Sequence, residues 1–430
     1  MFERRFVQFI ESLKKIFTNI ISKDIFLRLF FNFIILIVTI KVYKIFNLKD
    51  YLDITVFTAA IFILLIDFFI VSTINFVSTK TEDSLKTTDD YSKLISKYPL
   101  DEKYGYLYEF KNTKLNKIPH YIRRKFYKDD WNFNFYEKEV FPVRKLCSCK
   151  GKEIVLVDSD EIYRMSDDLL ENLNIIKDVH KNSNIYNNKA IRLDGVTEQD
   201  GRITLKTSRT TYFDFCASNR MIDYVKKNKR TIRDDHLFGP LFPTLEESGM
   251  SNLLGFNCMV VSSDGHLIFI KRGNNVSIEK GKLGVGIQAS VKYMYTHIDK
   301  GKKIMDINDI YRSVYREFQD EIGVTLSDPE SIGDCFTDVY YDYVEAKPQL
   351  YFEFYLKEDD KGSSLKDIET YVSKKDKSML KDGNSVVAIP FDMCEDIYVS
   401  NFALAYKDSY YSMVPSASYC VARFLENQRN

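Results

Sequence analysis

Residues Arg316 to Val324 read Arg-Glu-Phe-Gln-Asp-Glu-Ile-Gly-Val and indicate a helix that carries an acidic cluster. Glu317, Asp320 and Glu321 are spaced i, i+3 and i+4, so on a regular helix their side chains share one face. Carboxylates held so close repel one another, and Mg²⁺ or Mn²⁺ removes that repulsion because carboxylate oxygens are preferred ligands of such cations. The stretch therefore predicts a metal site at these three residues, on a helix that ends at Gly323. The alternative is a solvated acidic helix.

The same stretch resembles the second half of the Nudix box. That family's pattern is Gly, five residues, Glu, seven residues and then Arg-Glu-apolar-x-Glu-Glu-x-Gly-apolar, and this chain has Asp320 in place of one Glu. The first half of the box departs from the pattern. Lys302 falls at the Gly position and Asn308 at the Glu position, while Gly301 and Asp309 lie one residue away.

The resemblance implies two possible roles for this helix. In a Nudix hydrolase, Arg316 would orient a box carboxylate by ion pairing. Metal ions held by Glu317, Asp320 and Glu321 would polarise a pyrophosphate and activate water. The departures in the first half of the box weaken the reading as an enzyme, whereas the intact Arg-Glu-x-x-Asp-Glu core supports it. A pyrophosphohydrolase and a binding module therefore both stay open.

The surrounding segments follow the order of elements in a Nudix domain. Cys258–Arg272 has the pattern of two strands joined by a tight turn. A glycine-rich segment at 281–286 precedes the acidic helix, and Gln349–Leu356 and Ser416–Leu425 have the patterns of a later strand and a closing helix. From this order we assign ligand binding to Arg272, Gly284 and Gly286.

The N-terminal part of the chain predicts a transmembrane hairpin. Residues 54–79 form an apolar run of 26 positions with one charge, Asp67. At about 1.5 Å per residue, this run is long enough to cross a bilayer core of about 30 Å. A shorter segment at 25–46 supplies the second helix, with a buried or interfacial helix as its alternative. An ionisable residue within a membrane helix is a functional-site candidate by default, so we assign Asp67 to a membrane site.

Basic residues flank the predicted hairpin on both outer sides, before residue 25 and after residue 79. This distribution predicts a multi-pass membrane protein with both termini in the cytoplasm. Residues 1–22 combine an apolar stripe at helical spacing with a basic polar side, a pattern typical of helices that lie on anionic membranes. A partner-binding helix is the competing interpretation.

Composition separates the chain from nucleic-acid-binding proteins. Lys plus Arg and Asp plus Glu number 61 each, so no net charge indicates a nucleic-acid polymer as partner. The seven scattered cysteines indicate reduced thiols. The 430 residues are divided into an amphipathic helix at 1–22, the hairpin at 25–79, a connecting region at 80–190, and a Nudix-like domain at 191–430 with its core at about 256–425.

A two-helix membrane hairpin joined to a Nudix-like domain resembles the membrane Nudix effectors of bacterial cyclic-oligonucleotide anti-phage signalling (CBASS), whose C-terminal module is the SMODS-associated Nudix domain. The resemblance implies a protein of the bacterial inner membrane whose cytosolic domain senses a cyclic oligonucleotide. Sensing would drive the transmembrane helices to form a homo-oligomer that damages this lipid bilayer. The alternative is a membrane-tethered, Mg²⁺-dependent hydrolase of nucleoside diphosphate derivatives. The predicted fold class is a membrane α-hairpin plus a cytosolic α+β Nudix-like domain with a mixed sheet between helices.

Overall fold

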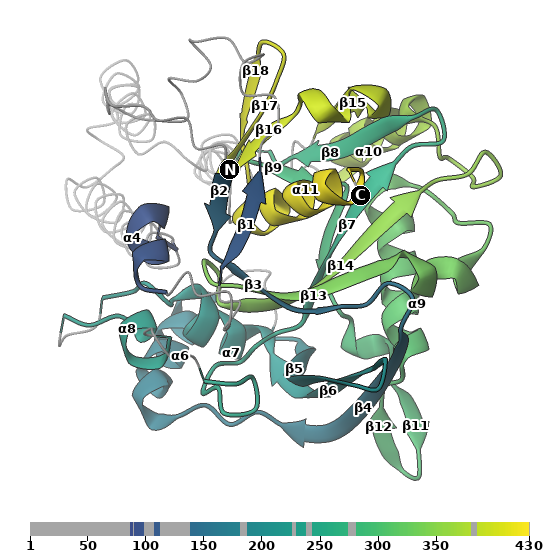
Figure 1. Cartoon of the computed structure of the whole chain (residues 1–430). Coiled ribbons are helices and arrows are strands. Elements are labelled where there is room, and N and C mark those ends of the chain that lie inside the picture. The colour runs from purple at the N-terminus through teal and green to yellow at the C-terminus, as the bar shows by residue number, and fades with distance from the viewer. Residues whose placement is uncertain are drawn as a thin grey trace, which may run out of the picture. The chain divides into compact units, whose positions relative to one another are not determined.

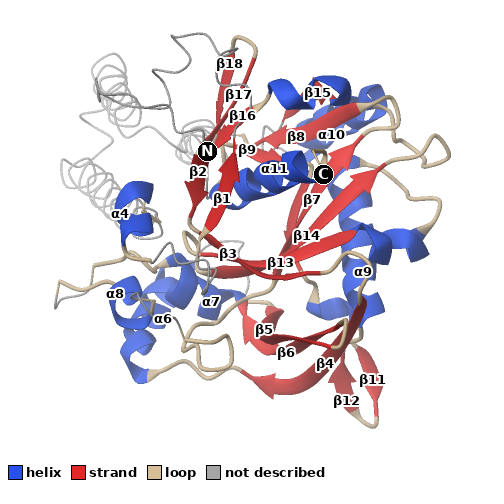
Figure 2. Cartoon of the chain, viewed as in Figure 1, coloured by secondary structure: helices blue, strands red, loops and turns tan. Residues whose placement is uncertain are grey.

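The computed structural model describes residues 87–88, 90–98, 107–111, 138–180, 187–225, 229–237, 243–273, 281–379 and 385–429 (Figure 1). All of these residues fall in one unit, 82–430. They form an α/β structure with mixed sheets, and helices pack on both faces of the largest sheet (Figure 2).

The helices are α4 (Tyr91–Ser96), α6 (Asp167–His180), α7 (Tyr212–Phe215), α8 (Ile232–His236), α9 (Ile307–Glu317), α10 (Leu365–Met379) and α11 (Pro415–Asn427). The strands are β1 (Tyr108–Lys111), β2 (Lys138–Phe141), β3 (Val143–Ser148), β4 (Glu153–Ile162), β5 (Lys189–Gln199), β6 (Arg202–Thr211), β7 (Gly255–Val261), β8 (His266–Lys271), β9 (Leu283–Val285), β10 (Ile287–Ser290), β11 (His297–Asp299), β12 (Lys302–Ile304), β13 (Phe336–Asp342), β14 (Lys347–Tyr355), β15 (Ser385–Pro390), β16 (Tyr398–Ser400), β17 (Ala403–Tyr406) and β18 (Ser409–Ser412).

Strand β7 lies inside an eight-stranded sheet whose main path is β15-β8-β7-β14-β13-β3. It pairs in parallel with β14, which places Gly255 opposite Gln349. Every residue of β7 is buried, as expected for a strand that is covered on both faces. The predicted strand-turn-strand at Cys258–Arg272 is confirmed by the β7–β8 hairpin, which turns at Gly265 with a φ of 77°.

The sheet forks along β7. Strand β8 pairs with the C-terminal end of β7, whereas β10 pairs with its N-terminal half. The chain passes from β9, which lies on β8, to β10 at Gly286. A Cβ at Gly286 would lie 2.9 Å from Cγ2 of Val260. Glycine is therefore required here by the close approach of two strands.

Alternation along β7 and β14 divides the core into two layers. On one face, Phe256 and Phe352 share a cluster with Ile310 of α9. On the other face, Met259 and Tyr351 share a cluster with α11. Helix α11 confirms the predicted closing helix, and β14 confirms the strand predicted at Gln349–Leu356.

A second, three-stranded sheet has the order β4-β6-β5 and shares the α9 core with the main sheet. A buried ion pair within this sheet contacts the segment of β12. Nη2 of Arg209 in β6 lies 2.6 Å from Oδ2 of Asp158 in β4. Asp158 also accepts a hydrogen bond from the backbone of Met305, and Arg209 donates one to the carbonyl of Lys303. Because a buried charge without its partner is costly, these contacts hold the second sheet against the segment that leads into α9.

Both ends of α9 are closed by side chains or backbone that suit a helix terminus. At its start, Asp306 and Asp309 form a reciprocal capping box. At its end, the chain continues through a π-helical turn, Phe318–Ile322, and stops at Gly323 with a φ of 75°. The predicted helix end at Gly323 is confirmed. A Cβ at this glycine would lie 2.4 Å from the Tyr371 ring of α10.

Within these described ranges, no helix has both the length and the apolar character needed to span a bilayer. The predicted fold class, a membrane α-hairpin with two transmembrane helices plus an α+β Nudix-like domain, is therefore corrected to an α/β structure with mixed sheets. The transmembrane and membrane assignments, and the multi-pass inner-membrane localisation, were wrong on the same finding. Physically, the longest of these helices, α10, has 15 residues, about 22 Å, and is rich in charge. Residues 1–22 and 25–79, including Asp67, lie outside the described residues.

Replacing Gly323 with Ala is expected to destabilise the protein by roughly 3 kcal/mol. A left-handed alanine costs about 1–2 kcal/mol, and overpacking against Tyr371 adds about 1–3 kcal/mol. Gly151→Ala is the matched control, because Gly151 has a φ of 74° with nothing within 4 Å of its Cβ. Urea unfolding followed by circular dichroism measures both. Equal losses for the two variants would show that α10 yields to the added methyl group without cost.

Candidate functional site

The predicted metal ligands lie at the C-terminal end of α9, but they do not sit on one regular helix. Glu317 is the last residue of α9, whereas Asp320 and Glu321 belong to the π-helical turn that follows. Glu317 is buried with 3% of its surface exposed, and the Asp320 and Glu321 side chains are partly exposed. The oxygens of the three carboxylates do not gather within 4.8 Å of one another, as a shared metal site would require.

Each of the three carboxylates is paired with a cation of the same chain. Oε1 of Glu317 lies 2.6 Å from Nζ of Lys292. Asp320 pairs with Arg316 at 3.1 Å, and Glu321 pairs with Lys375 at 3.2 Å. The predicted ion pair of Arg316 with a carboxylate of the box is thus present, with Asp320 as its partner.

Lys292 pairs directly with Glu317, and the charges of Asp320 and Glu321 also act on it. Burial lowers the pKa of Lys292, but the ion pair with Glu317 and the charges of Asp320 and Glu321 outweigh that effect and raise it. Burial raises the pKa of Glu317, and Lys292 opposes that rise. The lysine ammonium therefore supplies positive charge where a shared divalent cation would be expected to supply it.

The donor chemistry at these residues suits Mg²⁺ or Mn²⁺, but the geometry suits them only after Lys292 moves away. Oxygen ligands of the right kind are present. Each one already has a positive partner from the protein, and the three do not converge to within one coordination shell. Among the described residues, one group brings three potential metal-ligand atoms within 4.8 Å of one another: His297, Asp306 and Asp309.

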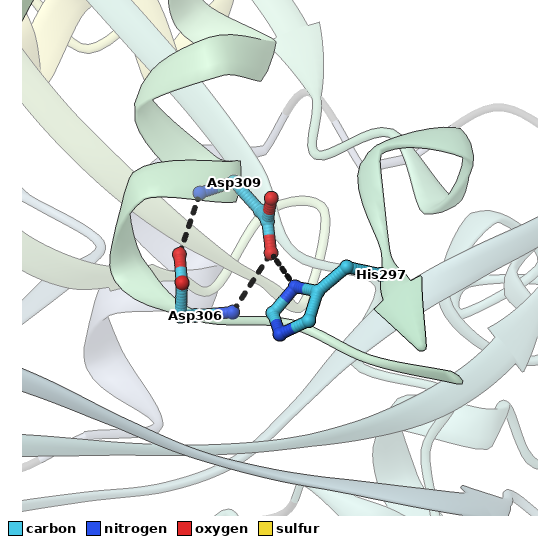
Figure 3. A group of neighbouring side chains, drawn as sticks. All are labelled: His297, Asp306 and Asp309. Atoms are coloured by element: carbon cyan, nitrogen blue, oxygen red, sulfur yellow. Dashed lines mark hydrogen bonds and ion pairs between the residues drawn. The ribbon is translucent and has the colours of Figure 1, made fainter. Parts of the chain in front are cut away.

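That second group closes the start of α9 (Figure 3). Oδ2 of buried Asp309 accepts the backbone N–H of Asp306 at 2.9 Å and lies 2.8 Å from Nδ1 of His297. Its other oxygen pairs with Arg312 at 2.8 Å. In return, Oδ1 of Asp306 accepts the backbone N–H of Asp309 at 3.1 Å. All these oxygens serve the helix cap, so the group has a structural role.

The first half of the Nudix pattern therefore finds no counterpart beside Glu317. Asp309 is eight residues before Glu317, which places it about 12 Å away along α9. Gly301 lies in the β11–β12 turn, where its φ of 79° requires a glycine-like conformation. If the first half of the pattern is shifted by one residue, its Glu position falls on Asp309, which caps α9, and its Gly position falls on Gly301, which lies in a turn.

An open pocket of about 760 Å³ lies beside Lys292. Its lining comes from the start of β5, from Tyr212 and Leu253, and from residues 289–294. Lys189 and Lys292 give the lining positive charge, and Tyr212 and Tyr293 give it aromatic rings. The pocket thus combines cations with flat apolar surfaces.

Three cationic side chains lie near the ring of Tyr293. The cationic groups of Lys189, Arg209 and Lys303 lie 5.3, 5.7 and 5.6 Å from the centroid of its ring. Cations at this distance are attracted by the negative face of an aromatic ring. Of these three cations, Lys189 lines the pocket.

The predicted ligand-binding residues divide into two kinds. Arg272 lies in a basic cluster around Glu345. Burial raises the pKa of Glu345, but the charges of Arg220, Lys347, Arg272 and Lys282 lower it, and the net shift is downward. Gly284 and Gly286 instead serve packing: a Cβ at Gly284 would lie 2.1 Å from Oε1 of Gln288, and Gly286 lies at the sheet fork.

Sequence reasoning missed the cations that define this site. Lys292, Lys347 and Arg220 belong to no motif, and Lys292 lies in the segment that separates the glycine-rich stretch from the acidic helix. The sequence Lys292-Tyr-Met-Tyr, a basic residue followed by aromatics, was the one local signal there.

Comparison of the chain with protein-family models and with curated proteins gives no match.

Replacing Lys292 with Met is expected to raise the affinity for Mn²⁺ at least about tenfold, because buried Glu317 loses its ion-pair partner and its repulsion by Asp320 and Glu321 is no longer offset. Isothermal titration calorimetry on the full-length chain measures this. Lys189→Met is the control, since it removes a pocket cation that makes no contact with the carboxylates. Lys292→Met combined with Glu317→Gln should bind Mn²⁺ no better than the parent. Unchanged affinity in the single variant would contradict this role of Lys292.

Proposed function

We propose that this protein carries a Nudix-type domain that binds a cyclic nucleotide and does not hydrolyse it. The observation that carries the proposal is the pairing of Lys292 with Glu317 at 2.6 Å, in the middle of the predicted catalytic carboxylates. Nudix-type hydrolysis depends on a divalent cation that polarises the pyrophosphate and lowers the pKa of water. A lysine ammonium neutralises the carboxylates but does not activate a bound water in this way.

The same lysine suits phosphate binding. An ammonium group donates hydrogen bonds to phosphate oxygens as a compact point charge. Lys292 and Lys189 both line the pocket of about 760 Å³, which is large enough for a dinucleotide-sized ligand. The negative charge of the phosphates would be met by these two side chains.

The aromatic rings of the pocket supply the second half of nucleotide recognition. Bases stack on tyrosine rings, and such stacking contributes about 1–3 kcal/mol per base. Tyr293 and Tyr212 both line the pocket. The choice of a cyclic nucleotide over a linear one rests on the resemblance to CBASS effectors. The signalling role in anti-phage defence rests on that resemblance alone, and the proposal contains no membrane step.

The test follows both binding and consumption of the ligand. Full-length protein is titrated with cyclic di-AMP, cyclic di-GMP and cyclic tri-AMP, and each ligand is then analysed by chromatography after incubation with Mg²⁺. We expect one of them to bind and to be recovered intact. Mg²⁺-dependent cleavage of ADP-ribose, with no cyclic nucleotide bound, would overturn the proposal in favour of a hydrolase.

Tyr293→Ala is expected to weaken binding of that ligand about tenfold, through the loss of one stacking surface. Tyr293→Phe is the matched control and should bind within about twofold of the parent, because it keeps the ring. Lys189→Met should weaken binding and also flatten its salt dependence, since it removes one phosphate contact. Equal affinity of Tyr293→Ala and the parent would show that the ligand binds elsewhere.

A further inference from the structure

Met294 has the most exposed side chain of the large apolar residues in the described part of the chain. It has 75% of its surface exposed and is the middle residue of the short 3-10 turn Tyr293–Tyr295. This exposure leaves the thioether sulfur open to oxidants in the solvent, and the oxidation of sulfur in proteins follows its accessibility.

The other methionines whose side chains the structure describes are less accessible. Met393 has 37% of its surface exposed, and its sulfur accepts a hydrogen bond from the hydroxyl of Tyr406 at 3.1 Å. Met165 is half-buried. The rest are at most 2% exposed: Met221, Met250, Met259, Met305 and Met413. A peroxide in solution therefore meets the sulfur of Met294 more readily than that of any of these residues.

Met294 also lines the pocket of about 760 Å³ beside Lys292. It follows Lys292 and Tyr293 directly in the chain, so these three residues reach the pocket from one short segment. The side chain of methionine is flexible and polarisable, and its sulfur packs favourably on aromatic surfaces. Met294 thus offers an apolar contact next to the ring on which a base would stack.

We propose that Met294 is an oxidation site and that its conversion to the sulfoxide weakens nucleotide binding in this pocket. The oxidant is a hydroperoxide, of which hydrogen peroxide is the simplest. A lone pair of the sulfur attacks one peroxide oxygen, and the S–O bond forms as the O–O bond breaks. The departing hydroxide takes the proton from the sulfur-bound oxygen, which leaves the sulfoxide and one water. The sulfur is oxidised and the peroxide is reduced by the same electron pair.

The sulfoxide changes the pocket in two ways. It turns a flexible apolar side chain into a polar one, which removes the apolar contact with a base. Its oxygen also accepts hydrogen bonds, and Lys189 and Lys292 line the same pocket. An ammonium that donates to the sulfoxide has fewer donors left for a phosphate. Both changes lower the affinity for a nucleotide.

A bound nucleotide and the oxidation of Met294 oppose each other. A base packed on the thioether covers its sulfur and slows attack by peroxide, and the sulfoxide in turn weakens the contact with the base. Because methionine sulfoxide reductases restore the thioether, the change is reversible. This opposition rests on the proposed function, whereas selective oxidation of Met294 in the free protein rests only on its exposure.

The first experiment measures the order in which the methionines react. Full-length protein is treated with graded doses of hydrogen peroxide, and mass spectrometry of its peptides follows the gain of one oxygen at each methionine. Met294 should be oxidised at least about fivefold faster than Met393, and Met259 should react more slowly than both. Equal rates at Met294 and Met393 would overturn the oxidation site.

The second experiment measures binding before and after peroxide treatment, by calorimetry with cyclic di-AMP, cyclic di-GMP and cyclic tri-AMP. The affinity of the parent for the nucleotide that binds should fall about tenfold on oxidation. For Met294→Leu, the affinities before and after peroxide should agree within about twofold, whatever the starting affinity. Met393→Leu is the matched control. It keeps Met294 and should lose affinity on oxidation as the parent does.

The outcomes separate the oxidation site from the proposed function. Selective oxidation of Met294, with no cyclic nucleotide bound by the untreated parent, would keep the oxidation site and overturn the proposed function together with the control of binding. Unchanged nucleotide affinity after full oxidation of Met294 would keep the proposed function and overturn the control of binding. An equal loss of affinity in peroxide-treated Met294→Leu would assign the effect to other residues and overturn it as well. Thermal melting before and after peroxide confirms that each protein is folded.

Discussion

The parallel pairing of β7 with β14 is the contact on which the rest of the domain depends. It places Gly255 beside Gln349 and fixes which side chains of both strands face α9 and which face α11. On the α9 face these side chains are apolar and close the core under the acidic helix. On the α11 face the same register brings Asn257 and Gln349 into one polar layer. A shift by one residue would exchange these two faces, so one register determines both the core and the polar layer.

Neutralisation of buried charge is the second constraint. Glu317 with Lys292, Asp158 with Arg209, and Glu345 with Arg220 are each pairs in which a buried carboxylate meets a cation of the same chain. Such pairs add little net stability, but removal of one partner is costly. They therefore hold separate segments in one arrangement.

The acidic helix shows how tertiary contacts change the chemistry of a local motif. Three carboxylates on one helix would attract a divalent cation. Here the three carboxylates do not gather within 4.8 Å of one another, and Lys292, which follows β10, pairs with Glu317. The acidic residues of the motif are present, and cations of the same chain balance their negative charge. Under the proposed function, the ammonium of Lys292 would bind a phosphate of the nucleotide.

Local spacing in the sequence determined the β7–β8 hairpin, the end of the acidic helix at Gly323, and strand β14 and helix α11. These features depend on neighbouring residues, namely a turn glycine, a left-handed helix end and an apolar period. The sequence also predicted a membrane hairpin, which is corrected above, and a metal cluster at Glu317, Asp320 and Glu321. Only the tertiary structure decided that Lys292 pairs with Glu317 and that Lys347 meets Gln349 over Gly255. Each of these depends on segments that are apart in the chain, or on which of several nearby partners a side chain chooses. No local pattern in the sequence specifies such choices, because the strand register and the packing of α9 between two sheets make them.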